Sequence, residues 1–156
     1  MDHLRRDFLK SIGVAGAMMA LFSAGLMKSG KVLAATWNNL AFTSKDTADA
    51  MKNAGYAGAA ESKDIMIKAP DIAENGAVVP IEVTSNIPGT SSIAIFVEKN
   101  PNPMIADFEF TNGAEPFIAT RVKMASTSIV RAAIKADGKV YTNTREVKVT
   151  IGGCGG

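Results

Sequence analysis

The sequence predicts a mainly β protein: an immunoglobulin-like antiparallel β-sandwich with one short N-terminal helix and a flexible, glycine-rich C-terminal arm. From residue 63 onward, apolar and polar residues alternate with a period of two, as in strands buried on one face. Turn-forming residues interrupt this alternation about every 8 to 14 residues, which indicates about seven short strands. The last strand-like run continues into Gly152-Gly153-Cys154-Gly155-Gly156, where the glycines favour a mobile backbone.

The alternating runs are bounded by turn-forming residues. The predicted strands lie around residues 65–67, 79–83, 93–97, 105–110, 118–124, 130–134 and 147–151. Asp137-Gly138 stands between two strand-like runs and is the strongest hairpin signal in the chain. Pro80 has no backbone N–H to donate, so it indicates an edge strand or a bulge. The predicted sandwich domain covers residues 35–151 and would lack the intersheet disulfide and buried tryptophan of antibody domains.

A single helix is predicted ahead of the strands, over residues 45–54. Thr43 or Ser44 can cap its first turn, the segment contains neither proline nor glycine, and Gly55 can end it. Its apolar content is thin, so we expect the helix to lie on the surface of the domain. The predicted anchors just before it are Trp37, Leu40 and Phe42.

Residues 1–34 are typical of an export signal. A basic start with Arg5-Arg6 precedes an apolar run over residues 12–27 and a small-residue exit, so we expect cleavage near Ala34 or Ala35. The paired arginines resemble the twin-arginine signal, although Leu4 stands where that pattern usually has Ser or Thr. A membrane anchor is the alternative, but glycines interrupt the run, which stays below the roughly 20 strongly apolar residues that a span needs. The expected location is the periplasm, with no membrane attachment after signal removal.

The composition of the mature chain excludes several classes of partner and cofactor. Of the 17 basic and 15 acidic residues in the whole chain, 12 and 13 remain after residues 1–34 are removed. This near-neutral balance gives no reason to expect nucleic acid or anionic membrane as a partner. The only histidine, His3, leaves with the signal, and one cysteine cannot by itself form a zinc, copper, haem or iron–sulfur site. We therefore expect no metal, no cofactor and no catalytic cysteine–histidine pair.

Cys154 is the only cysteine, and it stands between two glycine pairs. Free cysteine is normally among the most buried residue types, so a lone thiol in such an exposed place indicates use rather than packing. The nearest basic residue is Lys148, so nothing in the local sequence activates the thiol, and we do not expect an enzyme. The pattern favours a covalent carrier that holds a group on its thiol and presents it to partner enzymes. The arm would consist of Gly152, Gly153, Gly155 and Gly156.

The terminal Gly-Gly-Cys-Gly-Gly resembles the signature of SoxY, the sulfur-carrier subunit of the periplasmic thiosulfate-oxidising Sox system. Two further stretches are similar to that family: residues 69–80 (APDIAENGAVVP) and residues 97–103 (VEKNPNP). The shorter segments 121–124 (RVKM) and 146–149 (EVKV) are also similar. The resemblance covers nearly all of the mature chain, and the twin-arginine-like signal agrees with it. It implies an immunoglobulin-like fold, as the strand pattern does.

The resemblance also implies a mechanism. In the family, a c-type cytochrome enzyme joins thiosulfate oxidatively to the carrier cysteine, here Cys154, as an S-thiosulfonate. A hydrolase with a dinuclear manganese site releases sulfate, a sulfane dehydrogenase, where present, oxidises the remaining persulfide sulfur, and a second hydrolysis regenerates the carrier. The family works as a heterodimer with SoxZ, a second small sandwich protein. The loops at 69–80 and 97–103 would then face a partner, or simply shape turns.

Two other interpretations remain open. Gly155-Gly156 also resembles the end of ubiquitin-like thiocarboxylate carriers, although export, the strand-rich length and Cys154 count against this interpretation. The second is an exported structural β-sandwich that uses Cys154 for an intermolecular disulfide, because a lone cysteine in an oxidising compartment has no partner within its own chain. A Cys154→Ser substitution tests the first alternative, and the intact mass of the protein tests the second.

Overall fold

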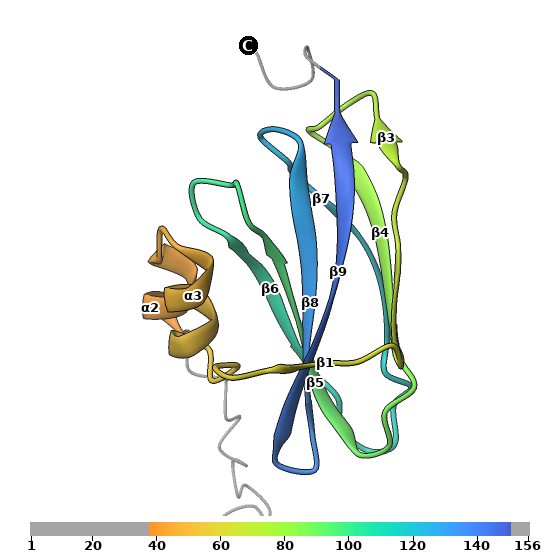
Figure 1. The fold of residues 1–156 in the computed structure, drawn as a ribbon. Coiled ribbons are helices and arrows are strands. Elements are labelled where there is room, and N and C mark those ends of the chain that lie inside the picture. The colour runs from red at the N-terminus through yellow and green to blue at the C-terminus, as the bar shows by residue number, and fades with distance from the viewer. Residues whose placement is uncertain (1–37, 151–156) are drawn as a thin grey trace, which may run out of the picture. The chain divides into compact units, whose positions relative to one another are not determined.

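The computed structural model describes residues 38–150, which form two β-sheets and two short helices (Figure 1). The larger sheet has the strand order β1-β9-β8-β5-β6, with β3 pairing a further part of β9, and the smaller sheet has the order β2-β4-β7. In chain order the elements are α2 (Asn39–Thr43), α3 (Thr47–Asn53), β1 (Ala60–Glu61), β2 (Ile65–Lys68), β3 (Ile72–Ala73), β4 (Val79–Ser85), β5 (Thr90–Val97), β6 (Met104–Glu109), β7 (Phe117–Val122), β8 (Ser128–Ala136) and β9 (Lys139–Val149). The prediction of a mainly β sandwich is confirmed.

The core lies between the two sheets. On β4, Ile81 and Val83 point inward while their polar neighbours point outward, and they share one apolar cluster with Ile93 and Ile95 of β5 and Ile134 of β8. Burying each such side chain is worth about 1.5–3 kcal/mol. A one-residue slip of a strand would turn its apolar face to water, so the core fixes the register of both sheets.

Strand β5 is buried on both faces, which the alternating pattern did not indicate. Ile93 and Ile95 belong to the core between the sheets, whereas Ala94 and Phe96 contact the helical segment on the other face of the large sheet. All four side chains are 0% exposed. The helices therefore cover part of the large sheet and leave the outer face of the small sheet open.

The prediction of a helix is right for residues 47–53 and incomplete before them. The cap of α3 is Asp46, whose carboxylate accepts hydrogen bonds from the backbone N–H groups of Ala48 and Asp49; the predicted caps, Thr43 and Ser44, are wrong. Gly55, with φ of +78°, follows the helix as predicted. No periodicity marks α2, because its five residues are less than two turns.

The predicted anchors of this segment have mixed outcomes. Phe42 is half-buried against the helical cluster, but Leu40 is wrong as an anchor because it is 70% exposed. Trp37 lies outside the described residues. The principal anchor is instead Tyr56, which follows α3 and is fully buried.

Tyr56 joins the helical segment to the large sheet through polar contacts. Its hydroxyl donates a hydrogen bond to Asp107 Oδ1 at 2.6 Å and lies 2.7 Å from Ser92 Oγ. The Nζ of Lys135 lies 4.1 Å from the ring centroid, within cation–π range, and donates to the backbone carbonyl of Ala54. Burial first, and then the Asp107 hydrogen bond, raises the pKa of Tyr56. Tyr56 therefore stays neutral and acts as a structural pin.

All seven predicted strands are present, as β2 and β4 to β9. Asp137 and Gly138 both have positive φ, 48° and 73°, and form the predicted two-residue hairpin between β8 and β9. Strand β9 begins at Lys139, earlier than predicted, because it pairs with β8 along its length. The prediction of a purely antiparallel fold is wrong in one respect: β1 and β3, each of two residues, pair with β9 in parallel.

Pro80 lies in β4, the middle strand of the small sheet, yet the expectation of an edge position holds locally. Strand β2 pairs with β4 only over residues 82–85. At Pro80 the single neighbouring strand is β7, where Arg121 is its partner. Because β2 does not pair with β4 at this position, the missing N–H of Pro80 leaves no β2 carbonyl without a hydrogen bond.

The predicted outer segments lie beyond the described residues. These are the signal over residues 1–34, the arm over residues 152–156 and Ile151, the expected end of the last strand. The boundaries of the 35–151 domain therefore stay predictions. Within residues 38–150, no helix is long and apolar enough to cross a membrane.

Candidate functional site

The predicted attachment residue and its arm lie outside the described residues; they are Cys154, Gly152, Gly153, Gly155 and Gly156. The structure describes the point from which they depart, Val149 and Thr150, which we call the arm base. In Figure 1, the end of β9 lies at the same end of the sandwich as the β5–β6 and β7–β8 connections and the chain after β3. The site can therefore be built from the arm base and the loops beside it.

One side of the arm base is held by β3. Ala73 is the register partner of Val149, and its carbonyl accepts a hydrogen bond from the backbone N–H of Thr150 at 3.1 Å. The hydroxyl of Thr150 donates to the carbonyl of Glu74 at 3.3 Å. On the same side, four residues before Val149, Arg145 forms an ion pair of 2.8 Å with Asp71. The two-residue strand β3 thus functions as a brace for the end of β9.

The other side of the arm base is held by Thr127, in the connection between β7 and β8. Its Oγ1 accepts a hydrogen bond from the backbone N–H of Val149 at 3.0 Å and lies 3.4 Å from the carbonyl of the same residue. The side chain thereby takes the place of a strand partner where the β8 pairing has ended, at Ser128 opposite Val147. The arm base is fixed from both sides up to the last described residue.

The loops beside the arm base are joined to one another. The side chain of Asn100 donates to the carbonyl of Lys123 at 2.7 Å and accepts from the backbone N–H of Ala125 at 2.9 Å. The N–H of Met124 donates to the carbonyl of Gly76 at 2.7 Å. The segments 69–80 and 97–103, singled out by their resemblance to a family, therefore both meet the β7–β8 connection next to the arm base.

An open groove runs between the start of β6 and the end of β7. It has a volume of about 570 Å³, and its apolar floor includes Met104 and Val122, both nearly fully buried. We call it the loop groove. Its lining consists of Asn100, Pro101, Asn102, Met104, Ile105, Arg121, Val122, Lys123 and Ala125.

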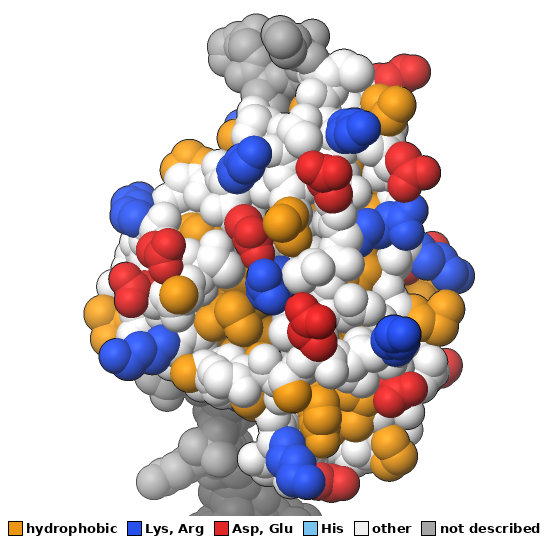
Figure 2. All heavy atoms as spheres, in the orientation of Figure 1, with side chains coloured by type: hydrophobic (Ala, Val, Ile, Leu, Met, Phe, Trp, Pro, Cys, Tyr) orange, Lys and Arg blue, Asp and Glu red, His pale blue; other side chains and the backbone are white. Residues whose placement is uncertain are grey.

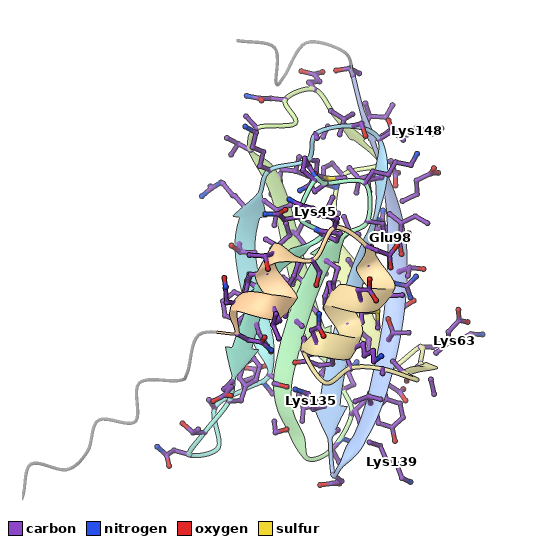
Figure 3. All side chains as sticks on the ribbon, turned by 90° about the vertical axis from the view of Figure 1, so that its left-hand side faces the viewer. Lys45, Lys63, Glu98, Lys135, Lys139 and Lys148 are labelled. Atoms are coloured by element: carbon purple, nitrogen blue, oxygen red, sulfur yellow. The ribbon has the colours of Figure 1, made fainter. Side chains whose placement is uncertain are left out.

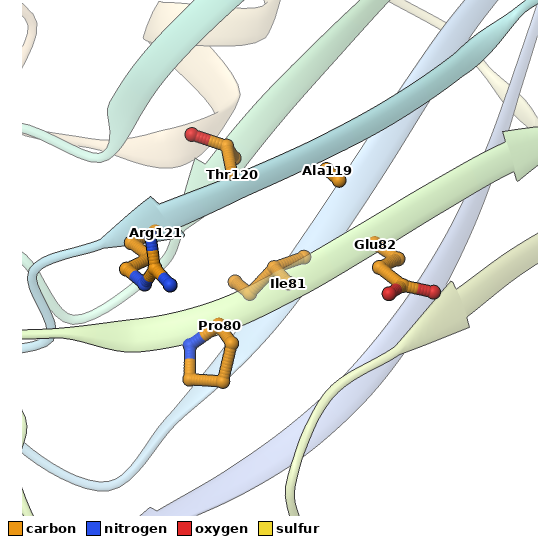
Figure 4. A pocket seen from close by; sticks show the side chains of 6 residues that line it. All are labelled: Pro80, Ile81, Glu82, Ala119, Thr120 and Arg121. Carbon is orange, nitrogen blue, oxygen red and sulfur yellow. The ribbon is translucent and has the colours of Figure 1, made fainter.

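A smaller hollow of about 210 Å³ lies on the outer face of the small sheet, where β4 and β7 run side by side (Figure 4). Pro80, Glu82 and Arg121 line it, so Arg121 borders both hollows. On the molecular face in Figure 2, basic and acidic side chains are interspersed and do not gather into a patch of one sign. That face therefore shows no broad charged surface.

No cluster of three or more His, Cys, Asp or Glu side chains occurs within residues 38–150. Sequence reasoning identified Cys154 and the flanking loops but missed Thr127, whose bond to Val149 spans 22 residues. The segment 121–124 contains three residues of the groove lining, Arg121, Val122 and Lys123, so its resemblance to the family was the available signal.

A β-sandwich whose last strand precedes a glycine-flanked cysteine in the sequence has the organisation expected of a carrier-type protein. The family model of the sulfur oxidation protein SoxY matches residues 51–154. The chain therefore belongs to the SoxY family. The structure of the sulfur carrier protein SoxY from Chlorobium limicola f thiosulfatophilum is similar, with 41% sequence identity and a TM-score of 0.61, and the match covers 70% of this chain and 96% of that chain. The comparison with curated proteins gave no match.

The family match confirms the resemblance drawn from the sequence. Its last matched residue is Cys154, so the match includes the predicted attachment residue as well as the sandwich. Together with the similar sulfur carrier structure, it supports a carrier role in sulfur oxidation.

Proposed function

We propose that the protein carries sulfur intermediates of thiosulfate oxidation as covalent adducts of Cys154 and presents them to partner enzymes. The observation that carries the proposal is the SoxY family match, which extends through the sandwich to the only cysteine of the chain. The braced arm base supports it, because a fixed departure point lets the glycine arm alone determine how far the thiol reaches. Four steps along the chain lead from Thr150, the last residue of the arm base, to Cys154, which allows a reach of up to about 14 Å.

The chemistry begins with oxidative attachment of thiosulfate. The Cys154 thiolate and thiosulfate form one S–S bond and release two electrons: Cys–S⁻ + S₂O₃²⁻ → Cys–S–S–SO₃⁻ + 2 e⁻. We assign the electrons to the c-type cytochrome enzyme that the family resemblance implies. Hydrolysis then gives Cys–S–S–SO₃⁻ + H₂O → Cys–S–S⁻ + SO₄²⁻ + 2 H⁺, and the manganese belongs to the hydrolase that performs this step. The carrier itself supplies a thiol and a tether, and no cofactor.

The cellular setting is part of the same proposal. Export by the twin-arginine route brings the chain to the periplasm, where thiosulfate and the partner enzymes are expected. A SoxZ-like subunit forms the heterodimer, and a sulfane dehydrogenase, where present, oxidises the persulfide sulfur. Tethering raises the effective concentration of each intermediate at a docked enzyme without tight binding of the small molecule itself.

A Cys154→Ser variant tests this proposal. Serine keeps the size and polarity of the residue but cannot form an S–S bond, so we expect thiosulfate-dependent cytochrome reduction to fall to background. A Ser91→Ala variant, altered on the exposed start of β5, serves as the control and should retain full activity. Retention of activity by Cys154→Ser would refute the cysteine carrier and favour a thiocarboxylate at the terminal glycine instead.

A further inference from the structure

The loop groove and the arm base share one stretch of chain. Ala125 lines the groove, and two residues later Thr127 holds Val149 by the 3.0 Å hydrogen bond. Two residues span at most about 7 Å, whereas the four steps from Thr150, the last residue of the arm base, to Cys154 allow about 14 Å. Even with the roughly 5 Å between paired strands added, the near wall of the groove is within the reach of the thiol.

The two sides of the arm base differ in charge. On the β3 side lie the exposed carboxylate of Glu74 and the Asp71–Arg145 ion pair, which carries no net charge. The lining of the loop groove contains two cations, Arg121 and Lys123, and no acidic residue. Among residues 38–150, neither of these cations forms an ion pair with a carboxylate. An anion on the arm would therefore meet two cations without a carboxylate partner on the groove side.

A third cation borders the groove from the helical segment. Lys45, between α2 and α3, donates from Nζ to Asn102 Oδ1 at 2.6 Å, and Asn102 lines the groove. Figure 3 shows Lys45 in the upper half of the molecule and Lys139 at the opposite end. Cations from two separate parts of the chain thus border one hollow.

The shape of the groove suits a glycine segment that carries sulfur. Its floor is apolar, with Met104 and Val122 nearly fully buried, and methionine and sulfane sulfur are both polarisable. Glycine has no side chain to obstruct a close approach of its backbone to such a surface. The cations at the rim would then meet the charged end of the adduct.

We propose that the loop groove docks residues 151–156 of the same chain when Cys154 carries an anionic sulfur group such as a thiosulfonate. The inference rests on the proposed function, because the anion is the proposed cargo. Docking shields the labile S–S bond of the adduct from thiols between visits to partner enzymes. Exposed ion pairs are individually weak, so we expect only about a two- to tenfold preference for the docked arm, which a partner enzyme can overcome.

Chemical loading of the full chain tests docking without any partner enzyme. Tetrathionate converts the Cys154 thiolate to Cys–S–S–SO₃⁻ and releases thiosulfate, and methyl methanethiosulfonate gives the neutral Cys–S–S–CH₃ and releases methanesulfinate. In ¹⁵N-resolved NMR spectra, we expect the anionic adduct to shift the backbone amide of Ala125 and the side-chain amide of Asn100. The neutral adduct should leave both signals in place.

The rate at which a thiol reductant removes the thiosulfonate gives a second readout. We expect the Arg121→Gln/Lys123→Gln variant to lose its adduct about two- to tenfold faster than the parent protein and to lose the NMR shifts. The control, Lys63→Gln/Lys139→Gln, removes the same charge from exposed positions outside the groove lining and should match the parent. In 1 M salt the protection should disappear, because the screening length falls to about 3 Å.

Three results would overturn docking. The first is a set of shifts confined to Thr127, Val149 and Thr150, and the second is equal shifts with the neutral adduct. The third is an equal shift when free thiosulfate is added to Cys154→Ser, which would make the groove a site for the free anion. None of these results would contradict the proposed function, because Cys154 is loaded chemically and no partner enzyme takes part. Conversely, if Cys154 proved unnecessary for thiosulfate-dependent turnover, the proposed function would fail, but the NMR comparison would still show whether the anionic adduct docks in the loop groove.

Discussion

The two-sided brace of the arm base predicts that Thr127→Val releases the end of β9. Valine has nearly the same shape as threonine but removes the oxygen that accepts the hydrogen bond from the Val149 N–H at 3.0 Å. An intramolecular hydrogen bond contributes about 0.5–1.5 kcal/mol, and an unsatisfied buried donor costs about 1–3 kcal/mol. Because Val149 is only half-buried, we expect a local loss of about 1–2 kcal/mol, which is a factor of about 5–30 in the opening equilibrium.

Amide hydrogen exchange measures this opening at single residues. The Val149 amide should exchange about 5–30-fold faster in Thr127→Val, while the amide of Ala133 in the centre of the large sheet keeps its rate. Thr144→Val is the matched control, because Thr144 lies exposed on β9 and its side chain makes no hydrogen bond with the described residues. An unchanged Val149 rate, or an equal acceleration in both variants, would show that Thr127 does not hold the arm base.

Three further substitutions test the fold around the site, each by urea unfolding. Tyr56→Phe should cost about 1–3 kcal/mol through its lost hydroxyl partners. Because its folded pKa is raised, the parent protein should also lose stability above about pH 10, where the unfolded tyrosine ionises first, and the variant should lose less. Gly89→Ala should cost about 1–2 kcal/mol or more, since Gly89 has φ of +70° and a Cβ there meets the Asp137 carboxylate. Asn100→Ala should cost about 1–3 kcal/mol by separating the two loops that it joins. An unchanged unfolding midpoint would contradict the assigned role in each case.

The strands were predictable because each one carries a local signal. Apolar and polar residues alternate in β4 because one face of the strand lies in the core. Asp137-Gly138 is a dipeptide that favours a two-residue hairpin turn, so it marks the turn between β8 and β9 in the sequence itself. The two-residue strands β1 and β3 carry no such signal. Their pairing with β9 depends on where the finished sandwich places them, which no short window of sequence contains.

The candidate site divides in the same way. Cys154 and its glycines stand out in the sequence, because a single thiol in a glycine segment is a property of the sequence alone, and their role stays a prediction. The brace is not, since the contacts of the arm base with Thr127 and Glu74 span 22 and 76 residues. The loop groove also combines Lys45, Asn102 and Arg121 from three separate parts of the chain. Such sites arise only when the fold brings distant segments together.

The mass of the C-terminal peptide, taken from protein isolated from cells that are oxidising thiosulfate, tests the central claim most directly. The account predicts that the peptide containing Cys154 carries sulfur or thiosulfonate adducts, which a reductant removes and which are absent when thiosulfate is withheld. A peptide found only as the free thiol or as a disulfide-linked dimer, under conditions where thiosulfate is being consumed, would contradict it.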